Sequence, residues 1–153
     1  MVKIDKKVWQ YAHKSTNESD LILNELSHKY VVLFFYPRAN TPGCTKESVA
    51  FGEQIEAFNQ ADCAVYGISA DSLKKQQNFK AKYDMPIDLI ADTEEVLCHA
   101  FDVIQEKNMY GKKFMGIVRS TFVLNQKGEV LAEWRKVKVP GHVKEVLQSV
   151  TNL

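Results

Sequence analysis

A continuous run of β-branched and aromatic residues, from Tyr30 to Tyr36, leads directly into the start of a helix. Such a run is typical of a strand that is buried on both faces of a sheet. Thr41 and Pro42 follow as an N-cap and a first helical residue, and apolar residues then recur at helical spacing as far as Phe58. The sequence therefore predicts a buried strand followed by a helix over 42–59, which points to an α/β architecture.

The rest of the chain alternates between predicted strands and predicted helices. Strands are expected over 63–69, 87–91, 117–124 and 129–134. Helices are expected from Asp71 or Ser72 to about Tyr83, from Thr93 to about Phe101, and after Pro140. The Asn-Gln-Lys-Gly turn at 125–128 joins the last two strands into an antiparallel hairpin, and residues 21–23 are a candidate edge strand. We expect an α/β sandwich with a mixed central sheet flanked by helices.

Length and charge narrow the class of protein. The 153 residues are enough for one domain, which we expect to span 1–153. Twenty basic and nineteen acidic residues leave a net charge of +1, which argues against electrostatic binding to nucleic acid or to a membrane surface. The longest apolar run is too short to cross a bilayer, and residues 1–7 contain no apolar signal stretch. We therefore expect a cytoplasmic protein with no membrane and no nucleic-acid partner.

Three cysteines, Cys44, Cys63 and Cys98, are the residues most able to carry chemistry. Their odd number and the lack of a CxxC pair support neither a disulfide scaffold nor a zinc site. Cys44 falls in the first turn of the predicted helix, where free backbone N–H groups and the helix dipole stabilise an anion such as a thiolate. Thr41 places a hydroxyl three residues before this sulfur.

Two sequence blocks around these residues resemble one known family. Residues 34–37 (Phe-Phe-Tyr-Pro) run into 41–47 (Thr-Pro-Gly-Cys-Thr-Lys-Glu), and residues 111–124 (Gly-Lys-Lys-Phe-Met-Gly-Ile-Val-Arg-Ser-Thr-Phe-Val-Leu) form the second block. The chain is similar to the peroxiredoxins of the PrxQ type, also called bacterioferritin comigratory proteins. The resemblance implies a thioredoxin-like fold and a thiol peroxidase that reduces hydrogen peroxide and organic hydroperoxides without a cofactor or a metal.

The resemblance also implies a role for five residues. Cys44 matches the peroxidatic cysteine, which becomes a sulfenic acid, and Thr41 matches the hydroxyl that orients the peroxide and contacts the thiolate. Pro37 matches the residue that shields the pocket from water. Arg119 matches the arginine that favours the thiolate and the developing negative charge, and Glu47 the acid that holds this arginine. The chemistry agrees, because cleavage of an O–O bond needs an anionic nucleophile with donors aimed where charge develops.

The step that returns the sulfenic acid to the thiol has no obvious internal partner. PrxQ-type proteins often carry a resolving cysteine five residues after the first or on the next helix, but Val49 and the pair Phe79 and Lys80 stand at those places. Cys63 and Cys98 both fit small core positions, and of the two only Cys98 is a candidate, as the less favoured alternative, for resolving Cys44 after local unfolding. We therefore expect a one-cysteine cycle in which thioredoxin, glutaredoxin or glutathione reduces the sulfenic acid.

Other functions have less support. A thioredoxin-like disulfide oxidoreductase needs a second cysteine where Glu47 stands, and a cysteine hydrolase needs a base. The four histidines show no supporting pattern and are expected at the surface: His13, His28, His99 and His142. A non-turnover redox sensor or chaperone of the thioredoxin fold is the remaining alternative, supported by the missing resolving cysteine. PrxQ-type proteins are often monomeric, so a monomer is expected.

Overall fold

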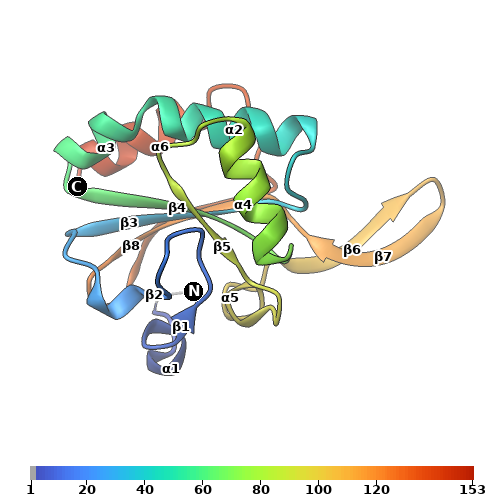
Figure 1. Ribbon diagram of the computed structural model, residues 1–153, viewed down its shortest axis with the longest axis horizontal. Helices are drawn as coiled ribbons and strands as arrows, with labels where there is room; N and C mark the ends of the chain where they lie inside the picture. Colours follow the sequence, from blue (N-terminus) through green and yellow to red (C-terminus); the bar gives the residue numbers. More distant parts are fainter. Residues whose placement is uncertain (1–2) are drawn as a thin grey trace.

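The computed structural model describes residues 3–153, and residues 1 and 2, which the predicted domain includes, lie outside the described residues (Figure 1). The elements in chain order are α1 (Lys6–Trp9), β1 (Ala12–His13), β2 (Leu21–Ile22), the 3₁₀ helix η1 (Leu23–Glu25), β3 (Tyr30–Phe35), α2 (Pro42–Glu53), α3 (Ile55–Gln60), β4 (Cys63–Ser69), α4 (Leu73–Lys82), β5 (Asp88–Ala91), α5 (Val96–Ala100), β6 (Ile104–Met109), β7 (Lys112–Ile117), β8 (Ser120–Asn125), β9 (Val130–Arg135) and α6 (His142–Thr151).

The central sheet has five strands in the order β5-β4-β3-β8-β9. Strands β3, β4 and β5 are parallel, whereas β8 pairs antiparallel with both β3 and β9. The predicted mixed sheet and its antiparallel hairpin are therefore confirmed. Strand β3 is the middle strand, and this position explains why its side chains are apolar on both faces.

Two separate cores cover the two faces of this sheet. Val32, Phe34 and Tyr36 face the core formed with helices α2, α3, α4 and α6. Val31, Leu33 and Phe35 alternate with them and face the core that α1, η1 and α5 close. Figure 1 shows these two layers, with α2, α3 and α6 above the sheet and α1 and α5 below it. The alternation places Cys44 and Cys98 in different cores, on opposite faces of the sheet.

The N-terminal segment lies along the free edge of β5. The amide of Thr16 donates to the carbonyl of Leu89 at 2.9 Å, and the amide of Ala91 donates to the carbonyl of Lys14 at 2.8 Å. These bonds cover an edge that would otherwise leave unpaired backbone groups. The predicted edge strand over 21–23 is only partly correct, because β2 pairs with β1 in a small sheet of its own and Leu23 begins η1.

The single helix predicted over 42–59 is two helices, α2 and α3, separated at Gln54. The amide of Gln54 closes a turn on the carbonyl of Phe51 at 3.2 Å, so the helical hydrogen-bond pattern is interrupted there. The break keeps Phe51 and Phe58 in the same core, with their ring centres 5.9 Å apart. Apolar spacing alone does not reveal it, because the spacing continues through the break.

Helix α5 begins three residues later than the predicted start at Thr93. Its N-cap is Glu95, whose side chain makes no capping bond, and the two carboxylate oxygens of Asp92 instead accept from the amides of Leu97 at 3.1 Å and Cys98 at 2.8 Å. The helix predicted from Asp71 or Ser72 is confirmed, with Ser72 accepting from the amide of Lys75 at 3.2 Å.

The strand predicted over 117–124 is wrong in its first half, because Val118 and Arg119 separate β7 from β8. Strand β7 belongs to a hairpin with β6 that the sequence analysis does not predict, and this hairpin extends away from the sheet in Figure 1. Tyr110 and Gly111 both have positive φ in its tight turn, at 53° and 78°. Arg119 therefore lies in the connection between β7 and β8, and not within an apolar strand.

Candidate active site

Cys44 lies in the first turn of α2, beyond the carboxyl end of β3, with only 1% of its surface exposed. Thr41 is the N-cap of this helix, as predicted, but its side chain makes no capping bond. The Thr41 hydroxyl donates instead to the carbonyl of Arg38 at 2.9 Å. The expected contact between this hydroxyl and the Cys44 sulfur is thus not formed here, because the hydroxyl hydrogen is directed to the preceding loop.

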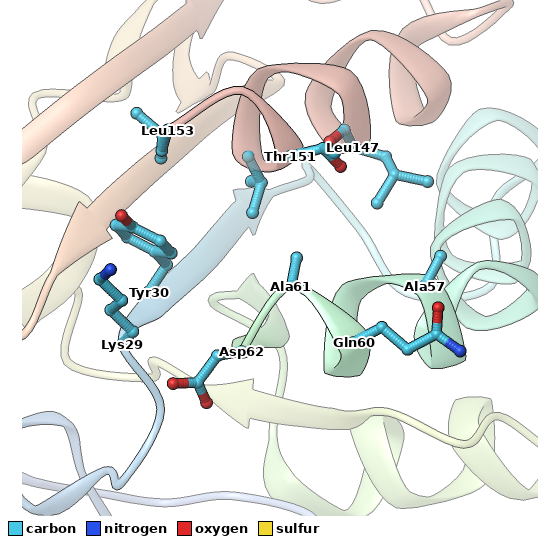
Figure 2. A pocket seen from close by; sticks show the side chains of 10 residues that line it. Lys29, Tyr30, Ala57, Gln60, Ala61, Asp62, Leu147, Thr151 and Leu153 are labelled. Carbon is cyan, nitrogen blue, oxygen red and sulfur yellow. Dashed lines mark hydrogen bonds between the residues drawn. The ribbon is translucent and has the colours of Figure 1, made fainter.

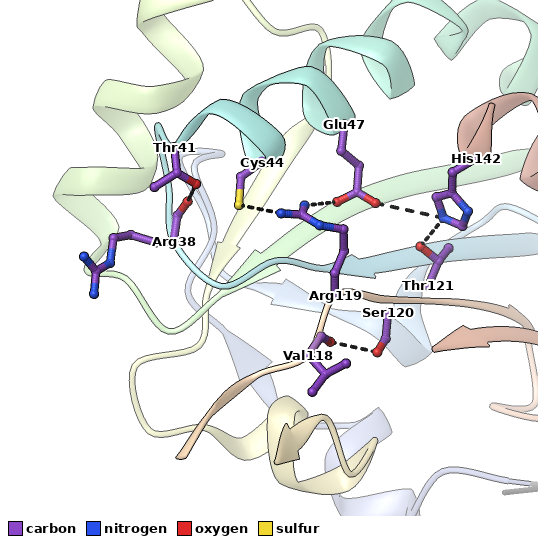
Figure 3. Close-up of polar contacts among 9 residues, drawn as sticks. All are labelled: Arg38, Thr41, Cys44, Glu47, Val118, Arg119, Ser120, Thr121 and His142. Atoms are coloured by element: carbon purple, nitrogen blue, oxygen red, sulfur yellow. Dashed lines mark hydrogen bonds and ion pairs between the residues drawn. The ribbon is translucent and has the colours of Figure 1, made fainter. Parts of the chain in front are cut away.

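One guanidinium joins the sulfur to a buried carboxylate, as Figure 3 shows. Arg119 donates from Nη2 to the Sγ of Cys44 at 3.2 Å and from Nη1 to the Oε1 of Glu47 at 2.8 Å. A Cβ on Gly43 would lie 3.2 Å from Nη2, so the glycine leaves room for the guanidinium beside the sulfur. The structure therefore brings Cys44, Arg119 and Glu47 together, with one guanidinium donating to both the sulfur and the carboxylate.

Glu47 is fully buried, and only one of its oxygens is paired. Its Oε2 has no hydrogen-bond partner among the described residues. Burial raises the pKa of Glu47 to about 7, and the neighbouring Arg119 limits the rise. Burial alone would lower the pKa of Arg119, but the anions Glu47 and Cys44 outweigh it and the pKa is raised. The arginine stays charged, while the carboxyl titrates close to neutrality.

His142 is a buried polar residue of this region, and no local sequence pattern indicates that it belongs to the site. It is 4% exposed, so the expected surface position is wrong, as it is for His13 at 2%. The Nε2 of His142 lies 2.7 Å from the Oγ1 of Thr121 and 3.9 Å from the Oε2 of Glu47. Burial lowers the pKa of His142 to about 4, and its ring is therefore neutral near pH 7.

Cys44 opens onto a pocket of about 580 Å³. Pro37, Arg38 and Thr41 form one side of it. The opposite side comes from the β6–β7 hairpin and is mostly apolar, formed by Ile104, Met109, Phe114, Met115 and Ile117. Lys107 also lines this side, and burial together with Arg119 lowers its pKa. The pocket can thus receive a molecule with a carbon chain and present its polar end to the sulfur.

A second hollow, of about 500 Å³, lies at the other end of β3, between α3 and α6 (Figure 2). Its lining includes Tyr30, Asp62 and Leu147 but none of the three cysteines. Because Tyr30 begins β3 and Cys44 follows the end of that strand, the two hollows lie at opposite ends of it. The cysteine chemistry therefore belongs to the pocket beside the hairpin.

The other two cysteines are free and fully buried. Cys63 begins β4 and is buried more deeply than its predicted half-buried position, which raises its pKa to about 12. Cys98 packs beneath the sheet as a core residue, and burial next to Asp92 raises its pKa well above the ordinary range. Neither thiol is primed as a nucleophile in this conformation.

The described residues, 3–153, contain no group of three or more His, Cys, Asp and Glu side chains placed to hold a metal ion. Among the helices of the same range, none has the length and apolar character needed to cross a membrane.

Comparison with known proteins assigns the chain to a family. The AhpC/TSA family model matches residues 4–133. The chain belongs to the AhpC/TSA family. Peroxiredoxin Bcp of Bacillus subtilis is 40% identical over 152 residues, which cover 99% of this chain and 97% of that protein. Peroxiredoxin Bcp of Xanthomonas campestris is 48% identical over 121 residues, covering 79% of this chain and 76% of the relative.

Solved structures agree with this family assignment. A structure of Xanthomonas campestris peroxiredoxin Q superimposes with a TM-score of 0.93 at 39% identity, covering 99% of this chain and 96% of that one. The Xanthomonas campestris bacterioferritin comigratory protein, studied for its alkyl peroxide reduction activity, also gives 0.93, at 38% identity and with 99% and 97% covered. The predicted thioredoxin-like peroxiredoxin fold is confirmed, and the chain is a thiol peroxidase of the Bcp/PrxQ type.

Proposed function

We propose that this peroxiredoxin reduces hydrogen peroxide and organic hydroperoxides at Cys44. The observation that carries the proposal is the guanidinium of Arg119, held between Cys44 Sγ at 3.2 Å and Glu47 at 2.8 Å. Cys44 and Arg119 line a pocket whose side formed by the β6–β7 hairpin is mostly apolar, and such a side suits an alkyl chain. The similar protein of Xanthomonas campestris reduces alkyl peroxides, which supports the same substrate class here.

The reaction follows from the placement of the sulfur. The Cys44 thiolate attacks the terminal oxygen of the peroxide, an S–O bond forms, and the O–O bond breaks. The electron pair of that bond leaves on the second oxygen, which takes a proton to become an alcohol or water, while the cysteine becomes a sulfenic acid. Arg119 donates toward the sulfur, next to the oxygens on which charge develops, and Glu47 keeps the guanidinium in this orientation.

Thr41 and Pro37 complete the peroxide site. The Thr41 hydroxyl donates its hydrogen to Arg38, so the lone pairs of its oxygen are free to accept from the O–H of a bound hydroperoxide. That contact would fix which oxygen faces the sulfur. Pro37 lines the pocket with an apolar ring that has no N–H, and it keeps water from the reacting atoms.

The sulfenic acid is recycled by an external thiol in a one-cysteine cycle. Cys98 lies on the opposite face of the sheet from Cys44, and the positions that carry a resolving cysteine in PrxQ-type proteins hold Val49, Phe79 and Lys80. Thioredoxin, glutaredoxin or glutathione attacks the sulfenic sulfur, water leaves, and a mixed disulfide forms. A second thiol then restores the Cys44 thiol and leaves as the oxidised disulfide.

The protein acts in this cycle as a cytoplasmic, monomeric, single-domain enzyme in antioxidant defence and redox homeostasis. The peroxidase proposal is tested by following peroxide loss with the three donors in turn, after subtraction of the loss that each donor causes without the protein. Wild type should consume peroxide with at least one donor, and Cys44→Ser with none. Equal, slow consumption by both proteins with every donor would favour the non-turnover redox sensor or chaperone.

The one-cysteine cycle is tested by intact mass after one equivalent of peroxide is added to the reduced protein. Wild type should gain one oxygen, which a sulfenic-acid reagent traps on Cys44. Cys63→Ser and Cys98→Ser are the matched controls, and both should turn over at the wild-type rate. Loss of two hydrogens within a monomer, mapped to Cys44 and Cys98, would show that Cys98 resolves the sulfenic acid.

A further inference from the structure

The buried carboxylate behind the active cysteine is only half paired. Oε1 of Glu47 accepts from Arg119 at 2.8 Å, but Oε2 has no hydrogen-bond partner among residues 3–153. An unpaired oxygen of a fully buried carboxylate is costly, because burial penalises its charged form. The polar group that faces this oxygen is the Nε2 of His142, at 3.9 Å (Figure 3).

The imidazole is held in this orientation from several sides. His142 is the first residue of α6, and its backbone amide donates to the carbonyl of Val139 at 3.1 Å. Its ring lies edge-on to Phe51 and to Trp134, with ring centres 6.2 Å and 5.8 Å away. Its Nε2 contacts the Oγ1 of Thr121 at 2.7 Å. The ring therefore has little freedom to turn its Nε2 edge away from Glu47.

We propose that His142 is a positioning residue of the peroxidase reaction: its Nε2–H, shared toward Thr121, faces the unpaired oxygen of Glu47 and keeps that carboxylate ionised, so that Arg119 stays on the sulfur of Cys44. The inference rests on the proposed reaction at Cys44. It assigns a role to a residue that does not touch the peroxide.

The charge of Glu47 selects the tautomer of the histidine. A neutral imidazole carries one N–H. If that hydrogen were on Nδ1, the lone pair of Nε2 would face the unpaired carboxylate oxygen, which is repulsive. With the hydrogen on Nε2, the ring donates to Thr121 and turns the positive end of its N–H dipole toward Oε2. The neutral ring thus supports the anion without forming a second ion pair.

The ionised form of Glu47 is the form that fixes Arg119. A protonated Glu47 would lose the Coulomb attraction between its carboxylate and the guanidinium, and would therefore hold Arg119 more weakly. The charged or titratable groups around the pair are Cys44 on α2, Arg119 before β8, Glu145 on α6 and Lys107 on β6. Glu145 accepts from the Nε1 of Trp134 at 3.2 Å, and its charge partly offsets the effect of burial on the pKa of His142.

The test is a carboxyl titration that does not depend on turnover. Carbon-13 NMR of protein labelled in its glutamate carboxyls follows Glu47, whose signal is assigned by its loss in Glu47→Gln. His142→Phe should raise the Glu47 titration midpoint by about one pH unit or more, because the N–H is lost while the aromatic ring remains. His142→Gln should restore most of the wild-type midpoint, and Thr121→Val should give a smaller rise.

The kinetic arm follows the oxidation of Cys44 by peroxide between pH 6 and 9. A midpoint raised from about 7 to about 8 lowers the ionised fraction of Glu47 at pH 7 about fivefold, so His142→Phe should react about fivefold more slowly there and approach wild type near pH 9. His13→Phe, which alters the other buried histidine, should leave both readouts unchanged.

The outcomes separate this proposal from the peroxidase proposal itself. If His142→Phe lowers the rate equally at all pH values and leaves the Glu47 midpoint unchanged, His142 only fills space and the inference is wrong. If His142→Phe fails to fold, Thr121→Val carries the same test, because it removes the group that holds the Nε2–H, and a midpoint unchanged from wild type would then contradict the inference. A wild-type protein that shows the Glu47 titration but no oxidation of Cys44 would overturn the proposed function and leave the His142–Glu47 contact intact.

Discussion

The Nη2 of Arg119 donates to the Sγ of Cys44 at 3.2 Å, although 75 residues separate the two along the chain. The same guanidinium donates from Nη1 to Glu47 on the next turn of α2. A planar fork can serve both acceptors at once, because its donors are fixed relative to one another. The helix thus supplies the nucleophile and the anchor, and the chain between β7 and β8 supplies the cation.

Arg119→Lys should therefore be far less active than wild type, although it keeps the positive charge. A single ammonium cannot donate along both arms of the fork, so the donor beside the sulfur is lost or displaced. We expect the oxidation of Cys44 to slow by about a hundredfold, the usual cost of removing one donor from a charge-stabilising site. Stopped-flow measurement with one equivalent of peroxide checks this, with urea unfolding as the control for stability. A lysine variant as fast as wild type would show that charge alone is enough.

Gly43→Ala should separate activity from stability. The added Cβ would lie 3.2 Å from Nη2 of Arg119, so the guanidinium must shift by a few tenths of an ångström. The oxidation of Cys44 should slow, but by less than the about hundredfold cost of a 1 Å misplacement. The helix itself should gain less than the about 0.5–1 kcal/mol that alanine gains over glycine in the middle of a helix, because Gly43 lies in the first turn. An unchanged rate in the same stopped-flow assay would mean that Arg119 adapts without loss.

The apolar side of the pocket should select among peroxides. Phe114 and Met115 line it from β7, and both are exposed. Phe114→Ala and Met115→Ala should raise KM for a bulky hydroperoxide such as cumene hydroperoxide while leaving the rate with hydrogen peroxide nearly unchanged, because hydrogen peroxide has no alkyl chain to contact them. Leu131→Ala, an exposed apolar residue on β9, is the matched control. Equal losses with both peroxides would place these side chains outside the substrate site.

The residues of the site were predictable where they belong to local patterns. Cys44 and Thr41 are read from the start of α2, and Glu47 and Arg119 from the blocks that resemble the peroxiredoxins. Their roles in the reaction remain predictions. The local position of Arg119 was predicted wrongly, because an apolar run from 117 to 124 does not show that the chain changes sheets at Val118.

Two features, the β6–β7 hairpin and the burial of His142, were not predicted because no periodic sequence pattern indicates them. The β6–β7 hairpin is exposed over most of both faces, so its strands show no alternation of apolar and polar residues. Only the Tyr110–Gly111 pair hints at its tight turn. His142 has no motif around it, and its burial comes from the packing of α6 against Phe51, which is distant in sequence, and against Trp134 on β9.

The Glu47–His142 pair should also leave a signature in the pH dependence of stability. The pKa of Glu47 is raised from 4.5 to about 7 on folding, so the native state holds a proton that the unfolded chain has released, and stability falls as pH rises through this range. The pKa of His142 is lowered from 6.5 to about 4, so the unfolded chain binds the extra proton and stability rises from pH 4 to 6.5. Each effect is worth about 3 kcal/mol, and the two oppose one another.

Single variants should therefore expose slopes that wild type largely cancels. Glu47→Gln removes the titration of the carboxyl and retains that of His142. Its free energy of unfolding should therefore rise relative to wild type as pH increases from 4.5 to 7. His142→Phe removes the titration of the histidine and retains that of Glu47, with its midpoint raised further, so its free energy of unfolding should fall relative to wild type as pH increases from 4 to 6.5. Urea unfolding at half-unit steps of pH measures both differences, and the double variant removes both titrations and serves as the control. Difference curves that stay flat for both single variants would mean that neither group titrates differently in the folded and unfolded states.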